Sequence, residues 1–390
     1  MTAIARPWVP RIALGGFRLP VPGWPLRYQK GTAGRDLRLD FLRGWCLFSM
    51  VVDHAAGDHQ TFLFKVTGNG GYPMTGAHGF VFLSGIVFAL VYGKIIASEG
   101  WSKAVPKALR RAFTLYLVAV VLGLFDALFS VTPWGGGSAF VDAVSFGTLW
   151  NTLTLHGAND SLMTLYFLFI LAAPLALYAM QKGKTWLLAA ASSSLWIGHL
   201  VVPQHFGNPF EIFVPAAEWQ VFFVTGLVVG YHREALGRWL QGGRRRAYLA
   251  MLFTLFACLV VLQLAITIGW RPGSGSSASF DWLASQVYTE YEHNPPLHVL
   301  AIMVGFLGLY HLVDWFWEPL NALLGWFLIP IGSAALYVYI IHLVLVYYVL
   351  LHAPVFTQLD GVPLGLSLLA LMLGLWLMVK RRFLFRVVPR

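Results

Sequence analysis

Long apolar runs alternate with short polar connections along most of the chain. Ten of these runs approach the length of about 20 mostly apolar residues that an α-helix needs to cross a membrane. They lie at 37–56, 77–97, 108–131, 161–180, 185–202, 216–232, 247–269, 297–313, 323–350 and 363–380. The pattern predicts an all-α fold, a polytopic membrane bundle of about ten transmembrane helices.

The composition agrees with a membrane protein. Of the 390 residues, 58% are hydrophobic and only 11% are charged, whereas a soluble domain has roughly 25% charged residues. The net charge of +10 would suit nucleic acid, but the basic residues form short clusters between apolar runs, so we exclude nucleic acid as a partner. Cys46 and Cys258 both lie inside apolar runs, so neither a disulfide framework nor a metal site is expected.

The distribution of Lys and Arg predicts how the helices are oriented. Connections rich in Lys and Arg alternate with connections at 132–160, 203–215 and 351–362 that contain none. Because basic loops stay in the cytoplasm, both termini are predicted to be cytoplasmic. The resulting division is a cytoplasmic tail at 1–34 without an expected signal peptide, a transmembrane domain at 35–380 and a cytoplasmic tail at 381–390.

The first apolar run contains ionisable groups at both ends, within the stretch "RDLRLDFLRGWCLFSMVVDH" at 35–54. Arg43 and His54 are eleven residues apart, about three helical turns or 16 Å, and therefore share one face. Asp40 precedes Arg43 by three residues and is expected to pair with it. Ionisable groups inside a membrane usually face the bundle interior at a functional site. We therefore predict a catalytic stripe in which His54 accepts a proton near neutral pH.

A simpler interpretation is that these groups only reach toward the membrane surfaces. Arg35 and Arg38 would then extend to the cytoplasmic headgroups, while Asp53 and His54 would lie at the outer interface. Asp53 adjoins His54 but points about 100° away around the helix, which makes it a weaker candidate for a direct partner. It remains among the predicted catalytic residues.

Two further apolar runs contain polar candidates. Ser84 and Gly85 lie inside the second run, where small residues also permit close helix packing. His342 lies in the ninth run with Tyr339 one turn before it, and a structural core histidine is the alternative. A basic cluster precedes the third run and could bind phosphates, although the orientation rule alone also explains it. Its members are Lys103, Lys107, Arg110 and Arg111.

Other polar residues fall at the predicted outer ends of helices. They could hydrogen-bond a polyhydroxylated substrate and stack against its rings, or they could form an interfacial aromatic belt. These predicted substrate-binding residues are His78, Asn159, Asp160, Glu218, Trp219 and Gln220. Phosphate-binding loops, the GxSxG and HExxH motifs and the dinucleotide fingerprint are all missing from the sequence, which disfavours ATP-driven transport and serine hydrolysis.

Several segments together resemble the OpgC family. They are "RDLRLDFLRGWCLFSMVVDH", "FVFLSGIVFALVYG", "NDSLMTLYFLFILAAP", "EWQVFFVTGLVVG" and "SAALYVYIIHL". Arg43 and His54 match an Arg-x10-His spacing, and residues 82–85 match a Phe-Leu-Ser-Gly pattern. A late Ser-x6-His pattern is matched only in part, because Ala335 replaces the usual Ser ahead of His342.

The resemblance implies a membrane O-acyltransferase of the bacterial inner membrane, related to acyltransferase family 3. The OpgC family succinylates osmoregulated periplasmic glucans, with cytoplasmic acyl-CoA as the implied co-substrate and no permanently bound cofactor. His54 would be the general base, and Arg43 with the basic cluster would contact the CoA. The oxyanion stabiliser stays open between a helix dipole, Ser84 and His342.

Three functional hypotheses remain open at the level of sequence. The first is transfer of a succinyl or acetyl group to an extracytoplasmic glycan. The second is a secondary transporter or flippase for a sugar or lipid-linked glycan, although we find no inverted repeat with paired broken helices. The third is a non-catalytic partner in glycan assembly. The donor, the acceptor and the oligomeric state are not determined by the sequence.

Overall fold

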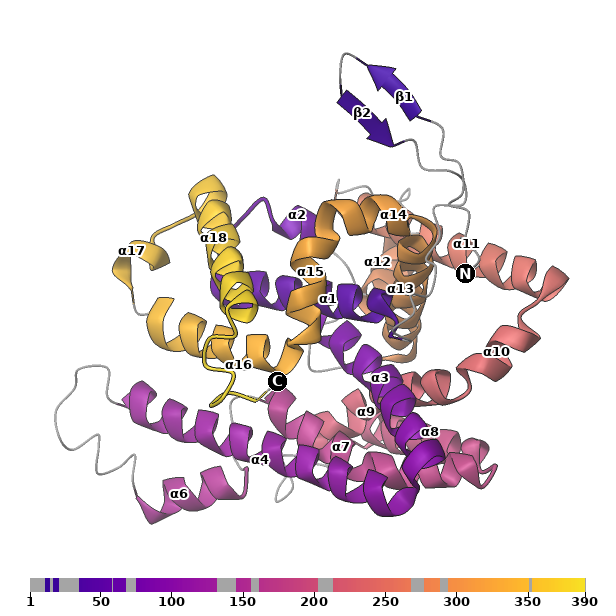
Figure 1. Cartoon of the computed structure of the whole chain (residues 1–390), viewed down its shortest axis with the longest axis horizontal. Coiled ribbons are helices and arrows are strands. Elements are labelled where there is room, and N and C mark those ends of the chain that lie inside the picture. Colours follow the sequence, from indigo (N-terminus) through magenta and orange to yellow (C-terminus); the bar gives the residue numbers. More distant parts are fainter. Residues whose placement is uncertain are drawn as a thin grey trace, which may run out of the picture.

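The computed structural model describes residues 11–14, 17–20, 35–57, 59–67, 75–131, 145–155, 161–202, 213–267, 277–287, 294–350 and 353–389. Strands β1 (Arg11–Leu14) and β2 (Phe17–Pro20) form an antiparallel hairpin. The rest of the described chain is helical (Figure 1). This confirms the predicted all-α bundle, to which the hairpin is a small addition.

The helices are numbered in chain order. The first half contains α1 (Leu37–Ala56), α2 (Phe64–Thr67), α3 (Gly76–Glu99), α4 (Trp101–Val131), α6 (Phe146–Leu153), α7 (Ser161–Gln181), α8 (Thr185–Val201) and α9 (Phe213–Tyr231). The second half contains α10 (Arg233–Trp239), α11 (Gly242–Thr267), α12 (Ser277–Val287), α13 (Pro296–Trp315), α14 (Trp317–Leu320), the π-helical η2 (Asn321–Gly325), α15 (Trp326–Ser333), α16 (Ala335–Leu345), the π-helical η3 (Val346–Leu350), α17 (Pro354–Thr357) and α18 (Gly361–Lys380).

Each of the ten predicted runs overlaps a helix, and the first coincides with α1 at both ends. Among the described residues, six helices are long and apolar enough to cross a membrane by themselves. They belong to α3, α4, α7, α11, α13 and α18. A bent pair of helices raises the number to seven. The chain is therefore a multi-pass membrane protein.

The ninth predicted run is not one straight helix. The helical segment 317–333 meets α16 at an angle of 87°, and Ala334 alone separates them. Pro330 cannot donate a backbone hydrogen bond, and the Gly332–Ser333 pair that follows is a common place for helices to kink. The predicted run at 323–350 is therefore not one continuous helix, and its two halves can count together as one broken span.

Helix α1 lies at the centre of the bundle. It contacts α3 on one side and α15, α16 and α18 on another (Figure 1). Asp36 caps its start by accepting a hydrogen bond from the Arg38 amide, and Gly57, with φ of 54°, ends it. Gly44 and Gly332 let α1 and α15 touch, since a Cβ at Gly332 would lie 1.8 Å from the Asp40 carbonyl oxygen. The polar side chains of α1 are consequently buried at Arg38, Asp40 and Ser49 and partly buried at Arg43, Asp53 and His54.

A seam of glycines joins α3 to α9. A Cβ at Gly85 would lie 2.2 Å from the Phe223 carbonyl oxygen, and one at Gly226 would lie 2.1 Å from the Phe82 carbonyl oxygen. Small residues at such a seam let two helix backbones approach closely, as in many membrane bundles. Gly85 of the Phe-Leu-Ser-Gly pattern therefore serves packing, and this packing fixes the direction in which the adjacent Ser84 points.

Candidate active site

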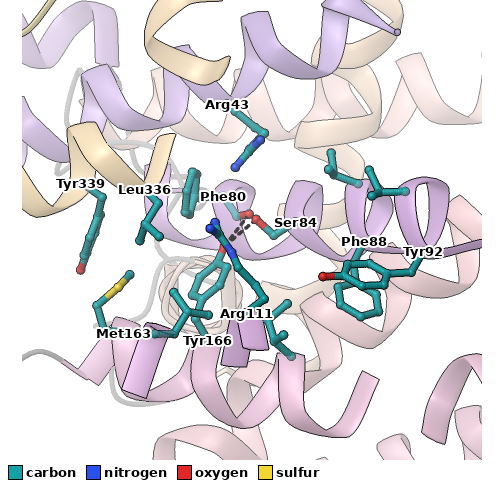
Figure 2. Close-up of a pocket in the computed structure, with 14 residues that line it drawn as sticks. Arg43, Phe80, Ser84, Phe88, Tyr92, Arg111, Met163, Tyr166, Leu336 and Tyr339 are labelled. Atoms are coloured by element: carbon teal, nitrogen blue, oxygen red, sulfur yellow. Dashed lines mark hydrogen bonds between the residues drawn. The ribbon is translucent and has the colours of Figure 1, made fainter. Parts of the chain in front are cut away.

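A cavity of about 230 Å³ lies between α1, α3, α4, α7 and α16. We call it the Arg43 cavity. Its wall is mostly aromatic and aliphatic, including Phe80, Phe88, Met163 and Leu336. Arg43 reaches into it from α1, and Arg111 reaches into it from α4 on the opposite side (Figure 2). Two cationic side chains thus share a small, largely apolar space.

The Arg43 side chain has a hydrogen-bond donor that no described protein group accepts. Its Nε atom is buried and has no hydrogen-bond partner among the described residues. Its guanidinium carbon lies 5.4 Å from the centre of the Phe80 ring, close enough for a cation–π interaction. A cationic group that faces an apolar cavity without a hydrogen-bonded anion is costly, so this half-buried side chain is poised to receive an anionic or strongly polar ligand.

Ser84 lies in the cavity wall together with Tyr166, which the sequence analysis did not single out. The Tyr166 hydroxyl is 2.8 Å from both Ser84 Oγ and the Phe80 carbonyl oxygen, and its proton can be donated to either (Figure 2). This contact joins α7 to α3 and orients the serine hydroxyl. The sequence does not indicate that this tyrosine orients Ser84, because tyrosine is common in membrane helices.

His54 and His342 form a pair that does not line the Arg43 cavity. His54 Nδ1 lies 3.0 Å from His342 Nε2, and the two rings are nearly parallel at 20°. His342 is fully buried in α16, while His54 is partly exposed. The Tyr347 ring lies 5.8 Å from the His54 ring. The structure therefore brings together the two histidines that the sequence analysis selected on different runs.

Helix α16 connects this histidine pair to the Arg43 cavity. Tyr339 lines the cavity, and its ring centre lies 5.2 Å from that of His342 on the next turn. On the other side Tyr339 stacks at 6.5 Å with Phe80, over which Arg43 lies. His54 thus contacts α16 through His342, and Arg43 lines the same cavity as Tyr339 of that helix.

The expected pairing of Asp40 with Arg43 is not what the structure shows. Asp40 Oδ2 lies 2.6 Å from Arg35 Nε, and Arg35 Nη2 donates to Asp40 Oδ1 at 2.8 Å. Arg35 precedes the helix and folds back over its first turn, whereas Arg43 points deeper, toward the cavity. Asp53 is half-buried beside His54, and its predicted catalytic role stays a prediction.

The basic cluster of α4 divides into two groups. Arg111 lines the Arg43 cavity, whereas Lys103, Lys107 and Arg110 are exposed. Residues 103, 107 and 111 are spaced by four, so they follow one another along one side of the helix. This row leads from the exposed end of α4 into the cavity.

A second polar region, which we call the Glu218 cluster, contains three of the predicted outer residues, His78, Glu218 and Trp219. Glu218 of α9 is only 2% exposed. Asn294 donates to its two carboxylate oxygens from the backbone N and from Nδ2, both at 3.3 Å. His199 Nδ1 of α8 lies 3.2 Å from Glu218 Oε1. Trp196 Nε1 in turn donates to the Asn294 carbonyl oxygen at 2.9 Å.

Aromatic rings complete this cluster. His78 stacks on Trp219 with ring centres 4.3 Å apart and meets His298 edge-on at 5.5 Å. His78 Nδ1 also lies 2.8 Å from Thr75 Oγ1. Gln220 faces away, where its amide donates to the Ser192 carbonyl oxygen at 2.8 Å. These side chains contact one another inside the protein, and the predicted Asn159 and Asp160 lie outside the described residues.

Comparison with known protein families identifies the family of this chain. Residues 35–383 match the family described as OpgC protein. The chain belongs to the OpgC family. No curated protein and no solved structure matches the chain. OpgC membership indicates a transferase-type membrane enzyme that takes part in glucan modification.

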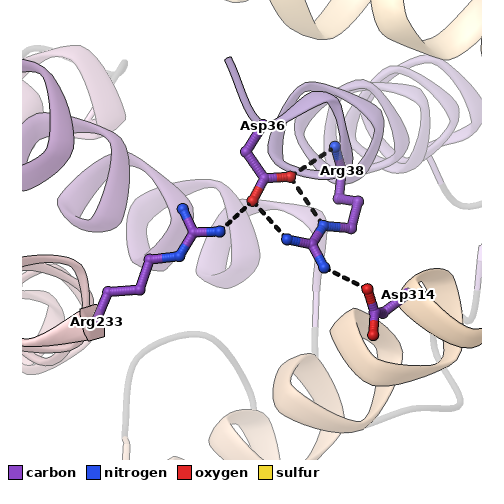
Figure 3. Close-up of polar contacts among 4 residues, drawn as sticks. All are labelled: Asp36, Arg38, Arg233 and Asp314. Atoms are coloured by element: carbon purple, nitrogen blue, oxygen red, sulfur yellow. Dashed lines mark hydrogen bonds and ion pairs between the residues drawn. The ribbon is translucent and has the colours of Figure 1, made fainter. Parts of the chain in front are cut away.

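The OpgC match begins at Arg35, where the chain enters the bundle. Asp36 accepts from Arg38 Nε at 2.8 Å and from Arg233 Nη2 at 2.5 Å, and Arg38 also pairs with Asp314 of α13 (Figure 3). Burial alone would raise the pKa of the Asp36 carboxyl, but Arg38 and Arg233 hold that pKa below its usual value. Arg38 therefore joins α1 to α13 instead of extending into the lipid headgroups.

Proposed function

We propose that this OpgC family member is a membrane O-acyltransferase that moves a succinyl or acetyl group from cytoplasmic acyl-CoA to a hydroxyl of a periplasmic glucan or another extracytoplasmic glycan. The observation that carries the proposal is the Arg43 cavity, which holds an incompletely matched cation and adjoins the His54–His342 pair through Tyr339. The pair supplies a proton acceptor, and the cavity supplies a space for the acyl donor.

The proposed topology follows from the charge pattern. Ten spans, counting α15 and α16 together as one broken span, would place both termini in the cytoplasm of a bacterial inner membrane. Lys103 and Lys107 would then lie at the cytoplasmic end of α4 and contact the phosphates of the CoA. The pantetheine arm would extend along the same side toward Arg111 and Arg43. In this binding mode the exposed Lys103 and Lys107 and the cavity-lining Arg111 would all contact the same CoA molecule.

The proposed chemistry is a balanced acyl transfer. The neutral imidazole of His54 takes the proton of the acceptor hydroxyl while the hydroxyl oxygen attacks the carbonyl carbon of the thioester. The tetrahedral intermediate collapses by breaking its C–S bond, which forms the ester and releases the thiolate of CoA. The His54 imidazolium then returns the proton to that thiolate. Ser84 or a helix dipole would stabilise the oxyanion.

The decisive experiment is an acylation assay with purified protein in lipid nanodiscs. Labelled succinyl-CoA and acetyl-CoA are each supplied with glucan, and the products are analysed by mass spectrometry. We expect a mass increment that identifies the acyl group, and its loss in His54→Ala with an unchanged thermal unfolding temperature. Full activity in that variant would exclude His54 as the base.

One observation favours the transporter alternative, namely the broken helix formed by α15 and α16. Broken helices occur at the substrate sites of many transporters, where two of them occupy corresponding positions in inverted repeats. The described part of this chain contains one such pair. Glycan uptake into protein-containing vesicles without acylation would support a transporter, whereas acylation without uptake would support the transferase.

A further inference from the structure

The hydrogen bonds of His342 determine which nitrogen of His54 carries the proton. His342 Nδ1 lies 3.3 Å from the carbonyl oxygen of Val338, one turn earlier in α16. A carbonyl oxygen can only accept, so His342 must carry a proton on Nδ1. His342 is fully buried, and a second proton would create a buried charge, so the ring is neutral and its Nε2 is an acceptor.

The same reasoning extends to the partner ring. Because His342 Nε2 accepts, His54 Nδ1 at 3.0 Å must be the donor. A neutral His54 then has its lone pair on Nε2, the atom that can remove a proton from a hydroxyl. The backbone of α16 thus selects the tautomer of a side chain on α1 through one intervening imidazole.

We propose that His342 is a positioning residue that holds His54 in the Nδ1–H tautomer and fixes the plane of its ring, so that Nε2 is the base. This deepens the proposed function and rests on it for the catalytic consequence. His342 neither contacts the reacting atoms nor exchanges the proton. It is therefore not the oxyanion stabiliser that the sequence left open.

Substitutions at position 342 test this role. Gln offers an amide oxygen that can accept from His54 Nδ1 but has no titratable proton, whereas Leu removes the acceptor. We expect His342→Leu to lower kcat on the order of 10²-fold, the lower end of what a positioned base contributes, with an unchanged KM for acyl-CoA. His342→Gln should restore kcat to within about 10-fold of the parent protein.

A matched control uses the same substitution elsewhere in the bundle. His311 of α13 lies 3.2 Å from the Tyr248 hydroxyl, away from the residues that line the Arg43 cavity. His311→Gln should leave kcat unchanged. If His342→Leu retains full kcat, or if His342→Gln is as inactive as His342→Leu while both proteins stay folded, the positioning role is overturned. The second result would assign proton exchange to His342 itself.

A spectroscopic measurement keeps the proposal testable if a variant at this buried site does not fold. The parent protein is labelled with ¹⁵N-histidine, and the His54 signals are assigned by their absence in His54→Gln. Protonated and unprotonated imidazole nitrogens have clearly separated ¹⁵N shifts. We expect a protonated Nδ1 and an unprotonated Nε2, and the reverse pattern would overturn the inference. Because this readout needs no acylation, it also separates failure of the inference from failure of the proposed function.

Discussion

The Arg43 cavity and the Glu218 cluster are both buried polar regions, yet they are built in opposite ways. In the cluster, Glu218 receives two hydrogen bonds from Asn294 and lies beside His199, and rings fill the space around it. In the cavity, Arg43 has a buried donor without a partner and about 230 Å³ of space in front of it. The Glu218 carboxylate is satisfied by the protein, whereas the Arg43 donor faces open space.

Under the proposed function, this difference would separate a structural region from a binding site. A buried polar group that is fully hydrogen-bonded costs little and rigidifies its surroundings. A buried cation that lacks a partner lowers the stability of the free protein and is retained where its unsatisfied charge is used. Polar residue types alone do not reveal the distinction, since both regions contain ionisable residues in apolar runs.

The largest expected effect concerns Arg43→Met. We expect the acyl-transfer rate to fall about 10²- to 10³-fold, because a desolvated charge that meets an anionic group contributes roughly 2–5 kcal/mol when it is truncated. The unfolding temperature should stay unchanged or rise, because a buried unmatched charge is removed. Initial rates with labelled acyl-CoA and thermal unfolding in detergent measure both quantities. If the variant unfolds at a lower temperature but has a normal rate per folded molecule, Arg43 has a structural role and does not act in the reaction.

The opposite result is expected for Glu218→Gln. Gln keeps one acceptor oxygen and puts an NH2 donor opposite one of the two Asn294 donors, so the free energy of unfolding should fall by about 1–3 kcal/mol. The acyl-transfer rate per folded molecule should stay within a few-fold of the parent rate. The control for charge loss is Glu234→Gln, which changes an exposed acid of α10. Thermal unfolding in detergent, followed by assay of the folded fraction, measures this. Loss of activity without loss of stability would show that the Glu218 cluster is part of the active site.

The smallest effect is expected for Tyr166→Phe. This change removes the hydroxyl that is shared between Ser84 and the Phe80 carbonyl oxygen. It should lower stability by about 1 kcal/mol, the typical net contribution of one hydrogen bond. We also expect a rate loss of about 5-fold, because Ser84 loses its fixed orientation. A thermal scan and initial rates check both values, and a rate loss above 10²-fold would show that the tyrosine acts on the substrate directly.

Periodicity and length predicted the helices well, because each apolar run has to satisfy its backbone internally as a helix. The run at 323–350 is the exception, since its length and apolarity were sufficient for a span while Pro330, Gly332 and Ser333 broke it. The helical spacing of Arg43 and His54 correctly placed them on one side of α1, facing α16. The meeting of His54 with His342 was not predictable, because it depends on how two distant helices pack.

The pairing of individual charges was also beyond sequence reasoning. Helical spacing favoured Arg43 as the partner of Asp40, but Arg35 precedes the helix, and the path of the chain before α1 brings it onto Asp40 instead. Glu218 and Trp219 suggested a surface for sugars, whereas α8 and the start of α13 cover them. Tertiary contacts determine which hydrogen-bonding groups remain available, and one sequence does not report them.

A single short helix, α16, carries both the Tyr339 face of the donor space and the imidazole that touches the base. The two positions are three residues apart, a rise of about 4.5 Å along the helix axis. Since a helix does not stretch, the separation between Tyr339 and the ring that contacts His54 is constant. Under the proposed function, α16 would therefore hold the donor space at a fixed distance from the ring that orients the base, and this distance would favour donors of matching length.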